Sequence, residues 1–206
     1  LIDRDHLENY QGVNRVGTII KGDAVSNYLL ELLEHKDLLV EEIAELSRSF
    51  NVKLFAPLLV SGASLKIYGS LENMLNAALL KPLLTFDLSS ASLLYVLIRM
   101  PTHLADKLSR SKIELAVTNW FKTKTTLQSI HVTEPIYTQE LNDRIDAVLF
   151  IGGFDTTQMF NETETKILPL KQKAVERGLI TDDLQVIEKI EADVPKIEET
   201  QLKTES

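Results

Sequence analysis

Residues 83–101 read LLTFDLSSASLLYVLIRMP, and this stretch decides the fold that the sequence predicts. Pro82 stops the helix before it, and the small residues at 89–92 lead directly into an apolar run over 92–100. Small side chains let the chain turn sharply onto a sheet, because they leave room for close packing. A run this apolar is expected in the middle of a sheet, with helices covering at least one face.

Periodicity predicts the elements on both sides of this central strand. In chain order, we expect helices over 37–50, 70–82 and 102–122, and strands over 53–63, 92–100, 127–137 and 144–154. Ser70 is expected to cap the second of these helices. This order predicts an α+β fold, a mixed four-stranded sheet with helices on one face. The short polar link at 138–143 predicts that the last two strands form a hairpin.

The two ends of the chain carry further helical patterns. Residues 4–35 are expected to form one long helix, although the glycines in its first half weaken that prediction. After the last strand, a helical extension is expected over 156–190, where Pro169 limits or kinks the first helix and Thr181 caps a second. Residues 191–206 lose the apolar periodicity, so we expect a disordered acidic tail.

The composition narrows the class of protein. Of the 206 residues, 44% are hydrophobic and 25% are charged, which is typical of a globular protein. No apolar run reaches the roughly 20 residues that span a bilayer. The net charge of −8 argues against a nucleic-acid-binding surface, which needs clustered basic residues. The chain has no cysteine, which excludes disulfides and thiolate sites and favours a reducing, cytoplasmic setting.

Several segments, in order along the chain, resemble the tubulin/FtsZ superfamily. NMLNAALLKPLLTFDLSSASLLYVLI (73–98) resembles the family pattern in which a helix ends in Pro-Leu-Leu and Asp, Ser and small residues lead into a core strand. YTQELNDRIDAVLFIGGFD (137–155) resembles a later family strand, GDELRVTVIATGFD. KGDAVSNYL (21–29) and LIDRDHL (1–7) resemble the long central helix and the strand end before it.

The resemblance implies the C-terminal, activation-side half of a cytoskeletal GTPase, including the central helix. In that family this domain is a mixed four-stranded sheet with helices packed on it. The chain would then contain the end of a nucleotide-binding domain with the central helix (1–36), the C-terminal domain (37–155), a helical extension (156–190) and the tail (191–206).

The resemblance also implies a cofactor and partners. Family members bind GTP, with Mg²⁺ as an accompanying ion, and assemble head to tail into filaments. The family's phosphate loop, GGGTGTG, has no counterpart here, so GTP would be held mainly by an N-terminal half outside this chain. We therefore expect the chain alone to be inactive, and GTPase activity only when it is joined to that half and assembled.

Three carboxylates, Glu42, Glu41 and Asp37, are the candidate catalytic residues. An ungapped alignment with the family's activating loop places Glu42 on its final Asp, and Leu39 on its first Asp. The resemblance implies that such carboxylates position the water that attacks the terminal phosphate bound by the next subunit. The alternative is that Asp37 caps a helix and that both glutamates are solvated first-turn residues, favoured by the helix dipole.

Asp23 and Ile19 are the candidate nucleotide contacts. The resemblance places Asp23 where the central helix reads the guanine edge, and Ile19 where an aromatic ring commonly stacks on the base. A carboxylate that accepts two N–H groups from guanine would favour GTP over ATP. The alternative is an ordinary surface aspartate. The four histidines show no metal-ligand spacing, so we expect no metal ligands among them.

Two other functions stay open at this point. One is a tubulin-like filament protein with degraded GTPase activity, because Leu39 replaces a family carboxylate. The other is a free-standing α+β protein-interaction domain that binds no nucleotide.

Overall fold

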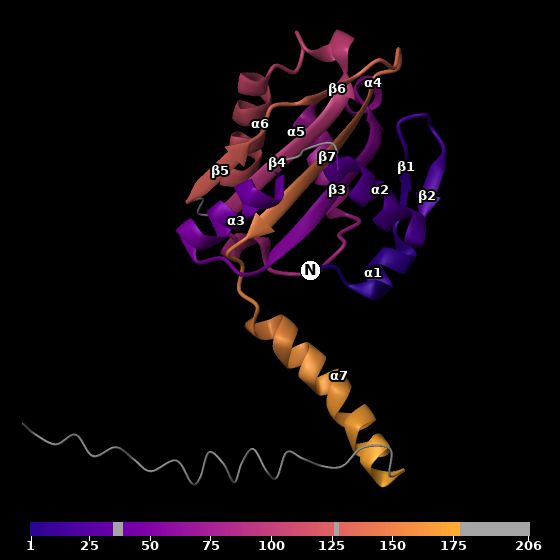
Figure 1. The fold of residues 1–206 in the computed structure, drawn as a ribbon, viewed down its shortest axis with the longest axis vertical. Coiled ribbons are helices and arrows are strands. Elements are labelled where there is room, and N and C mark those ends of the chain that lie inside the picture. The colour runs from indigo at the N-terminus through magenta and orange to yellow at the C-terminus, as the bar shows by residue number, and fades with distance from the viewer. Residues whose placement is uncertain (35–38, 126–127, 178–206) are drawn as a thin grey trace, which may run out of the picture. The chain divides into compact units, whose positions relative to one another are not determined.

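A mixed sheet of five strands forms the centre of the fold (Figure 1). β4 (Leu93–Pro101) lies inside this sheet and is paired along both of its edges. The structure, a computed structural model, describes residues 1–34, 39–125 and 128–177. All nine residues of β4 are buried, as its apolar sequence requires. The predicted α+β fold and the predicted central strand are therefore confirmed.

The other strands arrange themselves around β4. They are β3 (Phe55–Ser64), β5 (Ser129–Val132), β6 (Ile136–Thr138) and β7 (Arg144–Gly152). The sheet order is β3-β7-β4-β5, and β6 also pairs with β4. β7 is antiparallel to both β3 and β4, whereas β5 and β6 run parallel to β4. The sheet is therefore mixed, as expected.

Two details of the predicted sheet are wrong. The segment predicted as one strand over 127–137 forms two short strands, because Pro135 lacks the N–H that a continuous ladder needs. The last two strands do not form a hairpin, since β7 lies on the opposite side of β4 from β5 and β6. β7 is buried over most of its length, so it is stable only between two other strands.

Helices cover both faces of the sheet, rather than the single face that we expected (Figure 1). α2 (Asp23–Glu34) and α3 (Leu39–Phe50) pack on the face that carries Leu59, Val148 and Leu97, which share one register. α5 (Leu71–Leu79) and α6 (Arg110–Lys122) cover the other face. Trp120 of α6 donates a hydrogen bond from its indole N–H to Asn76 of α5, 2.9 Å away.

The helix boundaries test the predicted caps. Ser70 caps α5 as predicted, because its side chain accepts a hydrogen bond from the Asn73 N–H. The helix predicted over 102–122 is shorter: Thr102–Leu104 is a 3₁₀ turn (η2), and α6 begins after Ser109, whose extended backbone separates the two. The remaining short elements are α4 (Leu65–Tyr68) and the 3₁₀ turn η1 (Leu88–Ser90).

The long helix predicted over residues 4–35 is wrong in its first half. That half forms α1 (Arg4–Asn9) and a hairpin of β1 (Gln11–Val13) with β2 (Ile19–Lys21), and only α2 continues the predicted helix. Gly22 explains the boundary, since its φ of +55° ends the hairpin in a conformation that other residues avoid. The structure also places this hairpin beside β3 (Figure 1).

A second unit begins at Thr157, and its described part is α7 (Thr157–Glu176). Pro169 lies inside this helix and does not end it. The helix predicted to begin at Thr181 and the predicted tail lie outside the described residues. Among the helices that the structure describes, no helix is both long and apolar enough to cross a membrane.

Candidate functional site

The predicted catalytic carboxylates lie at the start of α3. Glu41 and Glu42 occupy its first turn, where Glu41 is exposed and the Glu42 side chain is 29% exposed. Asp37 lies outside the described residues, in the segment between α2 and α3. The sequence therefore places two of the three candidates together, at the N-terminal end of one amphipathic helix whose Ile43 and Leu46 pack on the core.

Glu42 is held by two side chains of the sheet. The Tyr95 hydroxyl of β4 donates a short hydrogen bond to Oε2 of Glu42. His131 of β5 lies opposite Tyr95 in register, stacks on its ring at 5.1 Å, and places Nε2 3.9 Å from the same oxygen. Burial, helped by the hydrogen bond to Glu42, raises the pKa of Tyr95, so Tyr95 stays a donor at neutral pH.

This contact limits what Glu42 can do chemically. The Tyr95 hydroxyl already donates to one oxygen of this carboxylate, so that oxygen is less free to take a proton from a water. Because the Glu42 side chain is still partly exposed, it can orient a water at the surface of α3. The geometry therefore suits positioning a water better than removing its proton.

The predicted nucleotide contacts lie elsewhere. Ile19 begins β2 and is 70% exposed, and Asp23 is an exposed residue in the first turn of α2. α2 continues to Glu34, about 17 Å further along its axis. Asp23 is therefore at one end of α2, and the segment that leads to the α3 carboxylates begins at the other.

No cation site accompanies these residues in the described ranges. No group of three or more acidic or histidine side chains there could hold a metal ion. Mg²⁺ usually keeps several waters and takes other ligands from nucleotide phosphates, so an ion that accompanies GTP does not require such a group.

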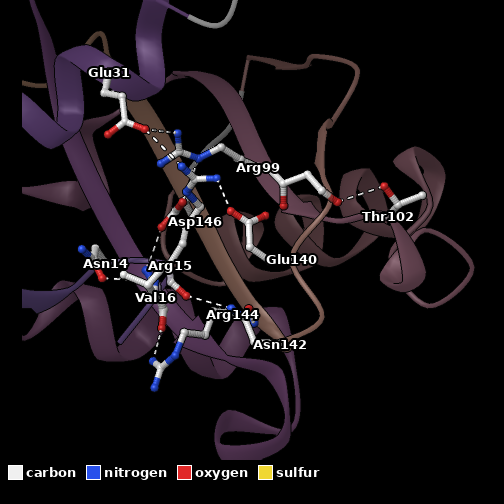
Figure 2. A network of polar contacts seen from close by, with 12 residues as sticks. Asn14, Arg15, Val16, Glu31, Arg99, Thr102, Glu140, Asn142, Arg144 and Asp146 are labelled. Carbon is white, nitrogen blue, oxygen red and sulfur yellow. Dashed lines mark hydrogen bonds and ion pairs between the residues drawn. The ribbon is translucent and has the colours of Figure 1, made fainter. Parts of the chain in front are cut away.

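Sequence patterns did not reveal a buried polar network at the other end of β4 (Figure 2). Arg99 Nε donates to Asp146 Oδ2 at 2.9 Å, and neither side chain has any exposed surface. Asp146 Oδ1 also accepts hydrogen bonds from the Tyr28 hydroxyl at 2.6 Å and from the Gly62 N–H at 2.7 Å. Burial alone would lower the pKa of Arg99, but the Asp146 charge raises it.

The network continues to the surface through α2 and the hairpin. Arg99 Nη1 donates to Glu31 at 3.0 Å, and Arg15, in the hairpin turn, contacts Glu31 at 3.3 Å and Glu140 at 2.6 Å (Figure 2). The signal that could have revealed it is a charged residue within each of two largely apolar strands, Arg99 in β4 and Asp146 in β7. Its paired charges join the hairpin, α2 and the sheet, which indicates a structural role.

Comparisons with known proteins give low similarities. No family model matches the chain, and no curated protein matches it. A structure of CetZ from Methanosaeta thermophila strain DSM 6194 is 15% identical over 80% of this chain and 43% of that chain, with a TM-score of 0.49. A plasmid segregation TubZ is also 15% identical, over 57% of this chain and 30% of that chain, with a TM-score of 0.38.

TubZ of Bacillus thuringiensis serovar israelensis, in a GTPγS-form protofilament, is a third match. It is 13% identical over 60% of this chain and 31% of that chain, with a TM-score of 0.39. The chain spans less than half the length of each of these structures. At these identities and TM-scores, the similarities do not assign a function to this chain.

Proposed function

We propose that this chain is the activation-side half of a tubulin/FtsZ-like GTPase that assembles head to tail. In this proposal, an N-terminal half binds GTP, and Glu42, Glu41 and Asp37 act on the nucleotide of the neighbouring subunit. Asp23 and Ile19 contact the nucleotide of the same subunit.

The observation that carries the proposal is the separation of the two sets of residues by α2. Asp23 begins this helix, and the segment that leads to Glu41 and Glu42 follows its end, about 17 Å away. In this proposal, one nucleotide contacts both sets where two subunits meet end to end. The order of the resembling segments and the mixed sheet around a buried β4 support the same proposal.

A second candidate, a filament protein with slow GTP turnover, is favoured by one contact. Tyr95 donates to Glu42, and Leu39 stands where the family has another carboxylate. The first feature limits proton removal by Glu42, and the second removes a group that would help to orient the water. A misplacement of about 1 Å costs on the order of 100-fold in rate.

The test measures phosphate release from GTP by the polypeptide that carries the GTP-binding half. We expect Glu42→Ala to lower the rate per assembled subunit by about tenfold or more, because it removes a water-positioning group. Nucleotide binding should be unchanged, since the carboxylate acts on the next subunit. Asp23→Ala should instead weaken GTP binding by about 1–3 kcal/mol, and turnover would fall only through occupancy.

Glu45→Ala is the matched control, since Glu45 is an exposed glutamate of the same helix. Equal turnover in Glu41→Ala, Glu42→Ala and Glu45→Ala would contradict the catalytic assignment. Sedimentation with and without GTP tests assembly independently. The 206-residue chain alone is expected to release no phosphate.

A further inference from the structure

A groove lies between the β1–β2 hairpin, the end of β3, and α4 and α5. Its volume is about 650 Å³. Its walls include apolar side chains from all four parts, namely Val13, Ile19, Leu59, Ile67, Met74 and Leu80. Glu42, Asp23 and the Arg99–Asp146 pair do not line this groove, and it shares Ile19 with the function proposed above. A protein-binding role for the groove goes beyond that function.

The groove is preformed, because hydrogen bonds fix its floor. β3 changes register between Val60 and Ala63, and Gly62 there has a φ of +50°. The Gly62 N–H donates to buried Asp146, and its carbonyl accepts from Arg144 at 2.7 Å. A Cβ at Gly62 would lie 2.3 Å from the Asn14 carbonyl oxygen, so the hairpin is in close contact with this point. A rigid site loses little freedom when it binds a partner.

Large apolar side chains on the walls of the groove are exposed. Leu80 is 83% exposed, Ile67 78% and Ile19 70%. Single exposed apolar residues are ordinary, but three around one concave surface form a patch of the kind that marks protein contacts.

The charges at the groove have one sign. Lys81 and Arg144 are the charged residues that line it, and no carboxylate does so. Lys81 Nζ donates to the Gln11 carbonyl at 3.0 Å, and Arg144 donates to the Gly62 carbonyl. Among the described residues, neither side chain has a carboxylate within ion-pair distance. On a chain with a net charge of −8, two cations paired only with carbonyls leave positive charge for a ligand.

We propose that the groove binds an apolar segment of a partner protein that carries carboxylates. The partner's apolar side chains lie against Ile67 and Leu80, and its carboxylates pair with Lys81 and Arg144. The combination of apolar walls with uncompensated positive charge favours this occupant over a purely apolar one.

Fluorescence anisotropy with two labelled probe peptides tests this. In one peptide leucine alternates with glutamate, and in the other leucine alternates with lysine. In an extended conformation, both present leucines on one face and charges on the other. We expect the glutamate peptide to bind about tenfold more tightly, as two partly exposed ion pairs allow. Equal affinities, or no binding of either peptide, would overturn the proposal.

Variants of exposed residues localise the binding without disturbing the core. Leu80→Asp and Ile67→Asp should each weaken glutamate-peptide binding by at least about tenfold. Leu80→Ser should act in the same direction, and Lys81→Glu should reverse the preference between peptides. Leu115→Asp on α6 is the matched control, because Leu115 is 62% exposed and does not line the groove. Unchanged binding in Leu80→Asp would overturn the proposal.

Two related measurements would reveal a different occupant of the groove. If the chain self-associates in sedimentation and Leu80→Asp abolishes this, the groove binds a second copy and the proposal is wrong. If a longer polypeptide with the GTP-binding half no longer binds the glutamate peptide, that half covers the groove, and the proposal is again wrong.

Discussion

Two tyrosines, Tyr28 of α2 and Tyr95 of β4, donate to carboxylates in different surroundings. Tyr28 donates to Asp146, which is fully buried and also accepts from Arg99 and Gly62. Tyr95 donates to Glu42, which is partly exposed and has the His131 Nε2 atom 3.9 Å from its carboxylate. The first carboxylate has no path to water, whereas the second can turn toward solvent.

This difference indicates which of the two carboxylates is free to act on a ligand. A buried carboxylate with three donors is fixed, and breaking its ion pair leaves an uncompensated charge in the core. A carboxylate at the start of a surface helix loses little when one donor is removed. Tyr28 and Asp146 therefore hold the hairpin and α2 on the sheet, whereas Glu42 has the exposure that a positioning role needs.

Breaking the buried ion pair is expected to have the largest effect. Arg99→Met removes the cation and leaves Asp146 charged in the core, so the free energy of unfolding should fall by about 3–5 kcal/mol. Urea denaturation followed by circular dichroism measures this. The double variant with Asp146→Asn should recover at least about 1 kcal/mol, because the amide oxygen still accepts from Tyr28 and Gly62. A double variant less stable than Arg99→Met would contradict the role of the unpaired charge.

The sequence predicted the elements whose signals are local. The apolar run of β4, the helical spacing of α3 and the Ser70 cap each depend on neighbouring residues, and the structure confirms them. The position of β7 between β3 and β4 depends on strand pairing, which no local pattern specifies. The hairpin before α2 was missed because its strands are three residues long, too short for a period to be visible.

The candidate site also combines features that the local sequence predicts with features that depend on contacts between distant residues. The sequence placed Glu41 and Glu42 together because they are adjacent on one helix. It could not supply Tyr95 as the donor to Glu42, since 53 residues separate them. Arg99 and Asp146 are charged residues in largely apolar strands, and only the register of β4 with β7 shows that they face each other.

Replacing each tyrosine by phenylalanine compares the two hydrogen bonds directly, because it removes only the hydroxyl. Phenylalanine at 28 keeps a ring beneath Arg99, and at 95 it keeps the stack with His131. We expect Tyr28→Phe to lower the free energy of unfolding by about 2 kcal/mol and Tyr95→Phe by about 1 kcal/mol, since Glu42 can be resolvated. Equal costs in urea denaturation would show that the Glu42 carboxylate is as fixed as Asp146.

Alkaline pH should distinguish the two hydroxyls through a smaller change in the free energy of unfolding. Burial raises the pKa of both tyrosines, and for Tyr28 the charge of Asp146 adds to it. An unfolded tyrosine ionises near its ordinary pKa of 10, whereas a raised pKa keeps the proton on the folded tyrosine to a higher pH, which for Tyr95 depends on whether Glu42 stays in place. The stabilisation by each hydroxyl is therefore fully present below pH 10 and is lost as the pH rises above it.

The stability gap between the wild type and Tyr28→Phe should thus narrow by about 1.4 kcal/mol between pH 9 and about pH 11. For Tyr95→Phe the gap should narrow less, because Glu42 can move away from a tyrosinate and Asp146 cannot. Urea denaturation across this pH range measures both, and Tyr137→Phe, at a residue that is 45% exposed, is the control for removing a surface hydroxyl. A constant gap for Tyr28→Phe would mean that its hydroxyl is not held against Asp146 in solution. A larger narrowing for Tyr95→Phe would mean that Glu42 is fixed, which would remove the physical basis for its positioning role.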